Sequence, residues 1–225
     1  MFPLRDSIAS ESTPYVTISL IVINVIVFIF QFTLSENQLH NLINLFGVVP
    51  ADFTGISIFQ ILLGGLFPFI SLFTAMFLHG GIIHLFGNMI YLWVFGDNIE
   101  DRIGHLGFLV FYLTAGVAGS FFHILTNPTS TVPTIGASGA VAGVLGAYFL
   151  LYPKAKVQAL VFLGFIFTVT RIRAVYFLFL WFVLQFINVL SSTQGTQPVA
   201  WWAHIGGFAV GAMIAFRYMQ QVRVR

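Results

Sequence analysis

Four polar side chains lie near the starts of strongly apolar segments, and together they are the types that serine hydrolysis uses. Ser138 and His204 are candidates for a nucleophile and its general base. A serine hydroxyl is a weak nucleophile at neutral pH, so it needs a base that accepts its proton. His84 and Asn88 are four residues apart and project from one face of a helix. Their N–H groups are of the kind that stabilises an oxyanion.

Each of these residues also has a plain structural interpretation. Ser138 can cap the helix that it begins. His204 follows a pair of tryptophans, which are typical of a membrane interface. His84 and Asn88 can pair with neighbouring helices, because buried polar residues in a membrane are costly and are usually paired or functional. The chemical interpretation therefore requires that the fold brings the four side chains together.

The composition indicates a polytopic membrane protein. Of 225 residues, 58% are hydrophobic and 7% are charged, and the mean hydropathy is +0.95. A soluble domain has about 25% charged residues. No polar linker divides the chain, so we expect one membrane domain over 15–219, between a short cytoplasmic segment, 1–14, and a basic cytoplasmic tail, 220–225. The chain has no cysteine, which excludes disulfides and thiolate sites, and a net charge of +2 is too small to indicate a nucleic-acid partner.

Hydropathy predicts an all-α bundle of six spans. These are 15–34, 81–99, 105–125, 138–152, 174–190 and 199–219. The mixed stretch 35–79 predicts short helices at the interface in the first external loop. The fourth span, of fifteen residues, rises only about 22 Å of the ~30 Å that a full crossing needs. We therefore expect its first residue to lie inside the bundle, below the membrane surface.

The basic residues predict the orientation of these spans. All nine Lys and Arg residues fall on one side of the six-span topology. The positive-inside rule assigns that side, and with it both termini, to the cytoplasm. The second, fourth and sixth spans then run from outside to inside. His84, Ser138 and His204 each lie near the start of one of these spans, so we expect them at one depth, a little below the external surface.

Glycines line the helix faces that begin at the serine and at the second histidine. Gly139 and Gly143 follow the serine along one face, and Gly207 and Gly211 follow the histidine at i+3 and i+7. Small-residue stripes let membrane helices approach closely. If the two stripes face each other, hydroxyl and imidazole can come within hydrogen-bond distance. The alternative is that the stripes only pack helices, as they do in many transporters.

The sequence fits a metal-dependent or an aspartyl protease mechanism poorly. The external half of each span lacks Asp and Glu, so we expect a Ser-His dyad and no acidic third member. His79 and His84 are a weak metal pair without an evident third ligand, and H-E-x-x-H is absent. Asp97 is the only candidate for an intramembrane aspartate, whereas an aspartyl protease needs two. We therefore expect no metal and no cofactor.

Four motifs in this order resemble the rhomboid family of intramembrane serine proteases, over about residues 15–219. They are FLHGGIIHLFGNM at Phe77–Met89, with its H-x-x-x-N pair, EDRIG at Glu100–Gly104, GASG at Gly136–Gly139, and AHIGGFAVG at Ala203–Gly211. The resemblance implies a six-helix bundle that cleaves within or beside a substrate's transmembrane helix, near its external end.

The resemblance also implies roles for individual residues. Ser138 would attack the scissile carbonyl while His204 takes its proton and later donates it to the leaving amine. His84, Asn88 and Gly136, with the Ser138 N–H, would stabilise the oxyanion. The implied partners are transmembrane-helix substrates and the lipid bilayer, without nucleic acid or metal. We also expect the fifth span to form the lipid-facing side through which substrate enters; it is bulky, with Phe177, Phe179, Trp181, Phe182 and Phe186.

The chain departs from some rhomboids at two positions. Its first external loop has no arginine, whereas some members have a Trp-Arg pair there. Ala142 occupies the position four residues after the serine, where some members carry an aromatic ring that stacks on the catalytic histidine. Because Ser138 and His204 are both present, an inactive relative is disfavoured.

Two other classes of protein remain as alternatives. A small transporter or channel would use the same polar residues to line a path, but the chain lacks interior charges and paired inverted repeats. A non-catalytic binder of membrane proteins would not need serine and histidine at one depth. The absence of a presequence and of further domains predicts a prokaryotic plasma membrane as the location.

Overall fold

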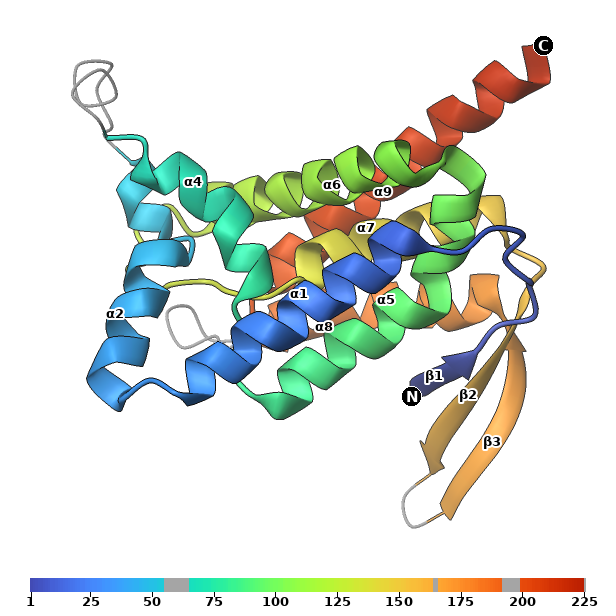
Figure 1. Ribbon diagram of the computed structural model, residues 1–225. Coiled ribbons are helices and arrows are strands. Elements are labelled where there is room, and N and C mark those ends of the chain that lie inside the picture. The colour runs from blue at the N-terminus through green and yellow to red at the C-terminus, as the bar shows by residue number, and fades with distance from the viewer. Residues whose placement is uncertain (55–64, 164–165, 192–198, 225) are drawn as a thin grey trace.

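Long helices build the protein, and they run roughly side by side (Figure 1). The computed structural model describes residues 1–54, 65–163, 166–191 and 199–224. In lipid the backbone must satisfy its own hydrogen bonds, so apolar sequence forms helices. The main helices in the described part are α1 (Tyr15–Phe32), α5 (Ile82–Ile103), α6 (His105–Thr126), α7 (Ser138–Leu151), α8 (Ala174–Ser191) and α9 (Trp201–Val224). The predicted all-α membrane bundle is confirmed.

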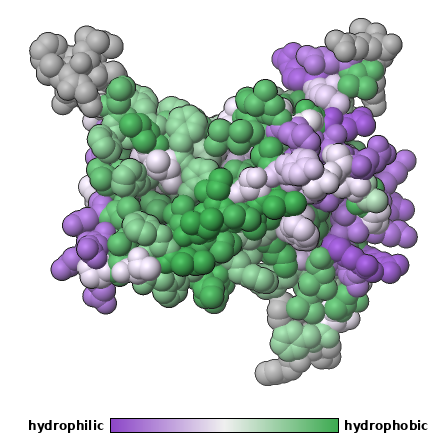
Figure 2. Space-filling view, in the orientation of Figure 1, coloured by the Kyte–Doolittle hydropathy of each residue, from purple (hydrophilic) through white to green (hydrophobic). Residues whose placement is uncertain are grey.

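Hydropathy of the surface agrees with a protein embedded in a membrane. Figure 2 shows a broad apolar belt around the middle of the molecule and hydrophilic residues gathered toward its two ends. Within the described residues, α1, α6 and α8 are long and apolar enough to cross a membrane, and α5 joins them if it counts as one bent span with the short helices before it. The six-span count stays a prediction, because α7 has only 14 residues.

Short helices form the connection between α1 and α5. They are α2 (Glu36–Phe46), η1 (Pro50–Phe53), α4 (Phe67–Thr74) and η2 (Ala75–Phe77), while the predicted loop residues 55–64 lie outside the described residues. Ser35 and Gln38 form a capping box at the start of α2. The chain bends by 82° between η2 and α5, at two consecutive glycines, Gly80 and Gly81. This bend starts α5 beside the site described below.

A small sheet at the opposite end of the bundle was not predicted. It has three antiparallel strands in the order β1–β2–β3, namely β1 (Phe2–Arg5), β2 (Lys156–Leu163) and β3 (Ile166–Arg173). The exposure of β2 follows a period of two: Val157 and Ala159 are buried, whereas Lys156, the first residue of the strand, is exposed. The N-terminal segment and the connection between α7 and α8 therefore carry regular structure that hydropathy did not predict.

The segment after β1 is held against the bundle by polar contacts. Asp6 accepts hydrogen bonds from the Tyr148 hydroxyl and from the Asn98 amide, the latter at 3.2 Å. Burial raises the pKa of the Asp6 carboxyl above its usual value. The Lys156 N–H donates to the Ser7 hydroxyl at 2.9 Å. These bonds fasten the start of the chain to α7 and β2.

Helix α7 lies at the centre of the bundle. Every residue from Gly139 to Tyr148 is buried. Its glycine face meets the glycine face of α9: a Cβ added to Gly207 would collide with the carbonyl oxygen of Gly139, and one added to Gly211 would collide with that of Gly143. The two backbones are therefore in direct contact along a seam that only glycine permits.

Candidate active site

Ser138 is the first residue of α7, and the loop before it is firmly held. The N-cap of α7 is Ala137, and no side chain caps the helix, so Ser138 does not act as its cap. Two backbone hydrogen bonds join Val48 and Thr134, at 2.9 and 2.8 Å. The Gly136 N–H donates to the Ala75 carbonyl at 2.8 Å. The connection between α1 and α5 thus braces the serine loop through its backbone.

His204 lies in the first turns of α9 and is 7% exposed. Its Nδ1 lies 2.8 Å from Oε1 of Gln185, a buried residue of α8. The amide nitrogen of Gln185 donates to the Trp181 carbonyl at 2.7 Å, so the amide presents its oxygen to the histidine. An amide oxygen only accepts, and Nδ1 must therefore carry the proton. The remaining ring nitrogen, Nε2, is buried and has no hydrogen-bond partner among the described residues.

Ser138 and His204 open into one cavity of about 800 Å³. It lies between α5, α7, α8, α9 and the loop that precedes the serine, and its lining includes Ser138, His204, His84, Asn88, Gln185 and Trp181. Among the described residues no hydrogen bond joins the serine hydroxyl to the histidine. Catalytic hydrogen bonds are often long before substrate binds. Both residues nevertheless line the same cavity, and Nε2 of His204 has no hydrogen-bond partner among the described residues.

His84 and Asn88 reach the cavity from α5. Gly136 has a φ of +124°, a left-handed conformation that favours glycine, and a Cβ there would lie 2.6 Å from the His84 ring. Glycine thus lets the imidazole lie directly against the serine loop. Asn88 is 7% exposed, and its amide nitrogen lies 3.0 Å from Nε2 of His79. One amide N–H of Asn88 remains to face the cavity.

His79 supports this pair from behind. It is 1% exposed, so it is a buried residue that packs inside the protein. The Gln31 side chain of α1 bonds both the N–H and the carbonyl of His79, each at 3.0 Å. Because these bonds fix the backbone of His79, its ring is held where Nε2 accepts the hydrogen bond from the Asn88 amide. Gln31 and His79 together hold Asn88 in place.

The four polar residues lie in a region that matches a known protein family. The rhomboid domain family model matches residues 67–221, which is more than half of the chain and includes all four polar residues. The chain belongs to the rhomboid family.

Relatives of this rhomboid come from distant organisms. RHOMBOID-like protein 6, mitochondrial, of Arabidopsis thaliana is 33% identical over 67% of this chain and 44% of its own length. Rhomboid protein 1, mitochondrial, of Saccharomyces cerevisiae is 37% identical over 41% of this chain and 28% of its own length. Rhomboid protease GluP of Bacillus subtilis is 44% identical over 36% of this chain and 15% of its own length.

The chain spans less than half the length of each of these relatives. Its place in the rhomboid family, together with its apolar helices, makes it an integral membrane protein. Two of the three relatives carry mitochondrial in their names, so the comparisons do not support the predicted prokaryotic plasma membrane. The cytoplasmic position of the termini stays a prediction.

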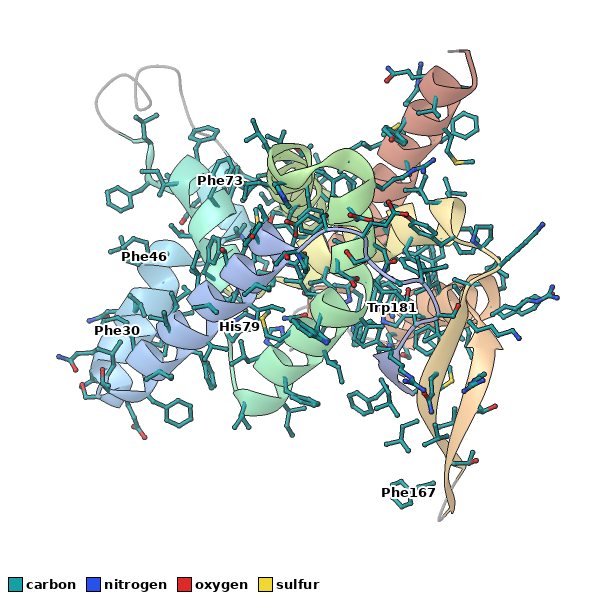
Figure 3. The ribbon with its side chains drawn as sticks, turned by 45° about the vertical axis from the view of Figure 1, so that its right-hand side comes forward. Phe30, Phe46, Phe73, His79, Phe167 and Trp181 are labelled. Atoms are coloured by element: carbon teal, nitrogen blue, oxygen red, sulfur yellow. The ribbon has the colours of Figure 1, made fainter. Side chains whose placement is uncertain are left out.

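The bulky residues of the fifth span, α8, do not all face outward in this rhomboid. Phe177 is 1% exposed and packs in the core, so it does not face lipid. Trp181 points into the bundle (Figure 3), lines the cavity, and has its ring centroid 5.9 Å from that of His204. Phe179, at 57% exposed, does face outward. The aromatic face of α8 is thus split between core, cavity and surface.

Trp181 and Gln185 contact His204 in this rhomboid, which has alanine and not an aromatic residue at position 142. Ala142 is fully buried. The ring contacts of His204 come instead from Trp181 of α8 and from Trp201, one turn before it, at 5.7 Å between centroids. Gln185 escaped the sequence-based search, although an uncharged polar residue inside an apolar span is a signal of function or pairing.

Proposed function

We propose that this rhomboid is an intramembrane serine endopeptidase that uses Ser138 and His204 as a catalytic dyad. The observation that carries the proposal is the state of the His204 imidazole. Gln185 holds its Nδ1–H, which leaves the lone pair on the buried Nε2, and His204 lines the same cavity as Ser138. A base with its proton fixed on the far nitrogen is prepared to accept the serine proton. The family includes a relative named as a protease, GluP.

The reaction would begin when the serine hydroxyl adds to the scissile carbonyl carbon. Nε2 of His204 takes the hydroxyl proton as the new C–O bond forms. The C–N bond then breaks, and the imidazolium gives its proton to the leaving amine. Water attacks the resulting ester, with His204 again as the base, and releases the serine. Gln185 stabilises the imidazolium in each step by accepting the Nδ1–H bond.

Three groups would stabilise the negative oxygen in the tetrahedral intermediate. Asn88 offers the amide N–H that His79 does not use, and His84 lies against the serine loop beside it. The first N–H groups of α7 have no partner within the helix and add the positive end of its dipole. Loss of one such donor typically lowers kcat by about 10²–10³-fold.

The substrate would be the transmembrane helix of another protein. Its backbone carbonyls are hydrogen-bonded within the helix, so a short stretch must unwind before Ser138 can attack. Substrates with small or helix-breaking residues near the cleavage site are therefore expected. The site would be reached through the side of the bundle closed by α8, because Trp181 and Gln185 of that helix form one wall of the cavity.

The test is cleavage of a labelled single-span substrate by the protein purified in detergent. Ser138→Ala and His204→Ala should each lower kcat by more than about 10³-fold, because neither half of the dyad works alone. Ser191→Ala and His40→Ala change the same residue types at exposed positions away from the cavity and should retain wild-type activity. A fluorophosphonate probe should label the wild type but not Ser138→Ala.

Two results would overturn the mechanism. Cleavage by Ser138→Ala at the wild-type rate would show that another group is the nucleophile. A wild type that neither cleaves nor reacts with the probe would favour a polar path for transport over a protease.

A further inference from the structure

The β2–β3 hairpin leaves the bundle sideways. Figure 1 shows it extending away from the helices, across the direction in which they run. Its near end joins two membrane helices directly: β2 begins five residues after α7 ends, and β3 continues into α8. The strands pair from Lys156 with Arg173 to Leu163 with Ile166. The hairpin therefore begins at the end of the bundle and reaches out beside it.

Cations gather at the near end of this sheet. Five of the nine Lys and Arg residues of the chain lie in or next to its strands: Arg5, Lys154, Lys156, Arg171 and Arg173. All five are exposed. Within the described part of the chain, none of them forms an ion pair. Paired residues of an antiparallel sheet project on the same side, so Lys156 and Arg173 present adjacent charges.

The described and exposed side chains of β3 farthest from the bundle are apolar. The sequence from Leu160 to Phe167 is LVFLGFIF, eight residues without a polar side chain. Phe167 is 66% exposed and Val169 49% exposed, and Figure 3 shows Phe167 projecting from β3 clear of the helices. Phe167 and Val169 project on the same side of β3 as Arg171 and Arg173, because alternate residues of a strand share a face. This face of the strand therefore has an apolar end and a basic end. A surface of this kind is unfavourable in water.

We propose that the β2–β3 hairpin is a second, non-spanning membrane anchor, whose apolar end enters the acyl boundary of the bilayer while its basic end binds anionic lipid headgroups. Anionic lipid is the partner that matches both halves: the exposed cations attract negatively charged headgroups, and aromatic and aliphatic side chains enter the adjacent hydrocarbon. The helices α7 and α8 place the hairpin at the edge of the apolar belt, where both environments meet. The hairpin is thus close enough to contact the bilayer that surrounds the helices.

The absence of cysteine from the chain makes the depth of the hairpin directly measurable. Phe167→Cys and Val169→Cys, each with a nitroxide spin label, would be reconstituted into phosphatidylcholine vesicles with and without phosphatidylglycerol. Collision with oxygen and with a water-soluble nickel chelate reports whether a label lies in hydrocarbon or in water. Ala9→Cys, an exposed position at the same end of the bundle, is the matched control.

Both hairpin labels should collide more often with oxygen than with the nickel chelate, and the Ala9→Cys label should show the reverse. The preference for oxygen should increase when phosphatidylglycerol is present. Replacing Lys156, Arg171 and Arg173 with Gln should remove that increase. The charge variant separates headgroup binding from simple burial of the apolar end.

Two outcomes would overturn the proposal. Labels at both hairpin positions that collide mainly with the nickel chelate, in both kinds of vesicle, would place the hairpin in water. The second outcome is broadening of the spin-label spectrum that disappears when the labelled protein is diluted with unlabelled protein. It would show that the hairpin packs against a second copy through β3, which is an edge strand of the described sheet. Each labelled protein would first be shown to elute as one species in detergent.

Discussion

Helix α7 meets α9 and helix α8 meets its neighbours by two different kinds of contact. Along α7 and α9 the backbones touch through glycine: Gly207 lies against the Gly139 carbonyl, and Gly211 against that of Gly143. Along α8 the contacts are made by large rings, such as Phe182 on Phe208 with 4.4 Å between centroids. In its most apolar stretch, α8 has 22% of its residues buried, against 44% for α6. The first contact is rigid, and the second is loose.

The difference matters for the proposed cleavage of a substrate helix that arrives from the side. Backbones in contact have no rotamers to change, so the seam of α7 and α9 keeps Ser138 and His204 at a fixed separation. Aromatic side chains can turn or separate, and each ring contact contributes only about 0.5–1.5 kcal/mol beyond its burial. We infer that the dyad is fixed by the first contact and that access to it is adjusted at the second.

The largest expected effect comes from breaking the rigid seam. Gly207→Ala or Gly211→Ala adds a methyl group where a backbone oxygen already stands. Overpacking typically costs about 1–3 kcal/mol, and a collision with backbone belongs at or above the upper end. Both variants should unfold at a lower temperature in detergent and lose most of their cleavage activity.

Gly107→Ala in α6 is the matched control for the seam. A Cβ there would lie 3.7 Å from its nearest neighbour, an ordinary contact with Ile103. Its thermal midpoint and activity should stay close to those of the wild type. If Gly207→Ala behaved like Gly107→Ala, the seam would not fix the dyad.

A smaller effect is expected at Gln185, through which α8 contacts His204 of α9. Gln185→Leu removes the acceptor of the Nδ1–H bond and leaves that group buried without a partner. An unsatisfied buried donor costs about 1–3 kcal/mol, which corresponds to roughly a 5- to 150-fold lower kcat if the histidine turns to avoid it. KM should change little, because Gln185 acts through the base.

Gln185→Glu distinguishes positioning from packing. Glutamate has nearly the same shape and keeps an oxygen that accepts from Nδ1. It should therefore retain much more of kcat than Gln185→Leu does. Equal losses of kcat in the two variants, each matched by an equal fall in thermal midpoint, would assign Gln185 a structural role only.

Much of the arrangement could be predicted from local sequence signals. Hydropathy and charge placed Ser138, His204 and His84 in one layer, and in the structure all three line one cavity. Gln185 could not be assigned to His204 in this way, because α8 is apolar on all sides and its sequence does not indicate which face turns inward. Contacts between distant segments decide that rotation.

The sheet escaped prediction for a related reason. Phe2 pairs with Leu160, so β1 exists only because the fold brings the two ends of a long segment together. Propensity of a single short stretch cannot reveal a partner so far away. The contact of His79 with Asn88 could not be predicted, because His79 lies in the bend before α5, where helical periodicity says nothing about burial.

The smallest effect is expected where the loose contact is loosened further. Phe182→Ala removes the ring that stacks on Phe208 and spares the residues that line the cavity. If opening of α8 limits access, kcat/KM for a transmembrane substrate should rise a few-fold, although the protein loses some stability. The matched control is Phe179→Ala, which removes a ring of the same helix that is 57% exposed.

Reactivity of Ser138 toward a small fluorophosphonate should be nearly unchanged in both variants, because a small probe does not need the helix to move. An equal rise for probe and substrate would show that the ring restrains the dyad itself, and the division between a rigid contact and an adjustable one would fail.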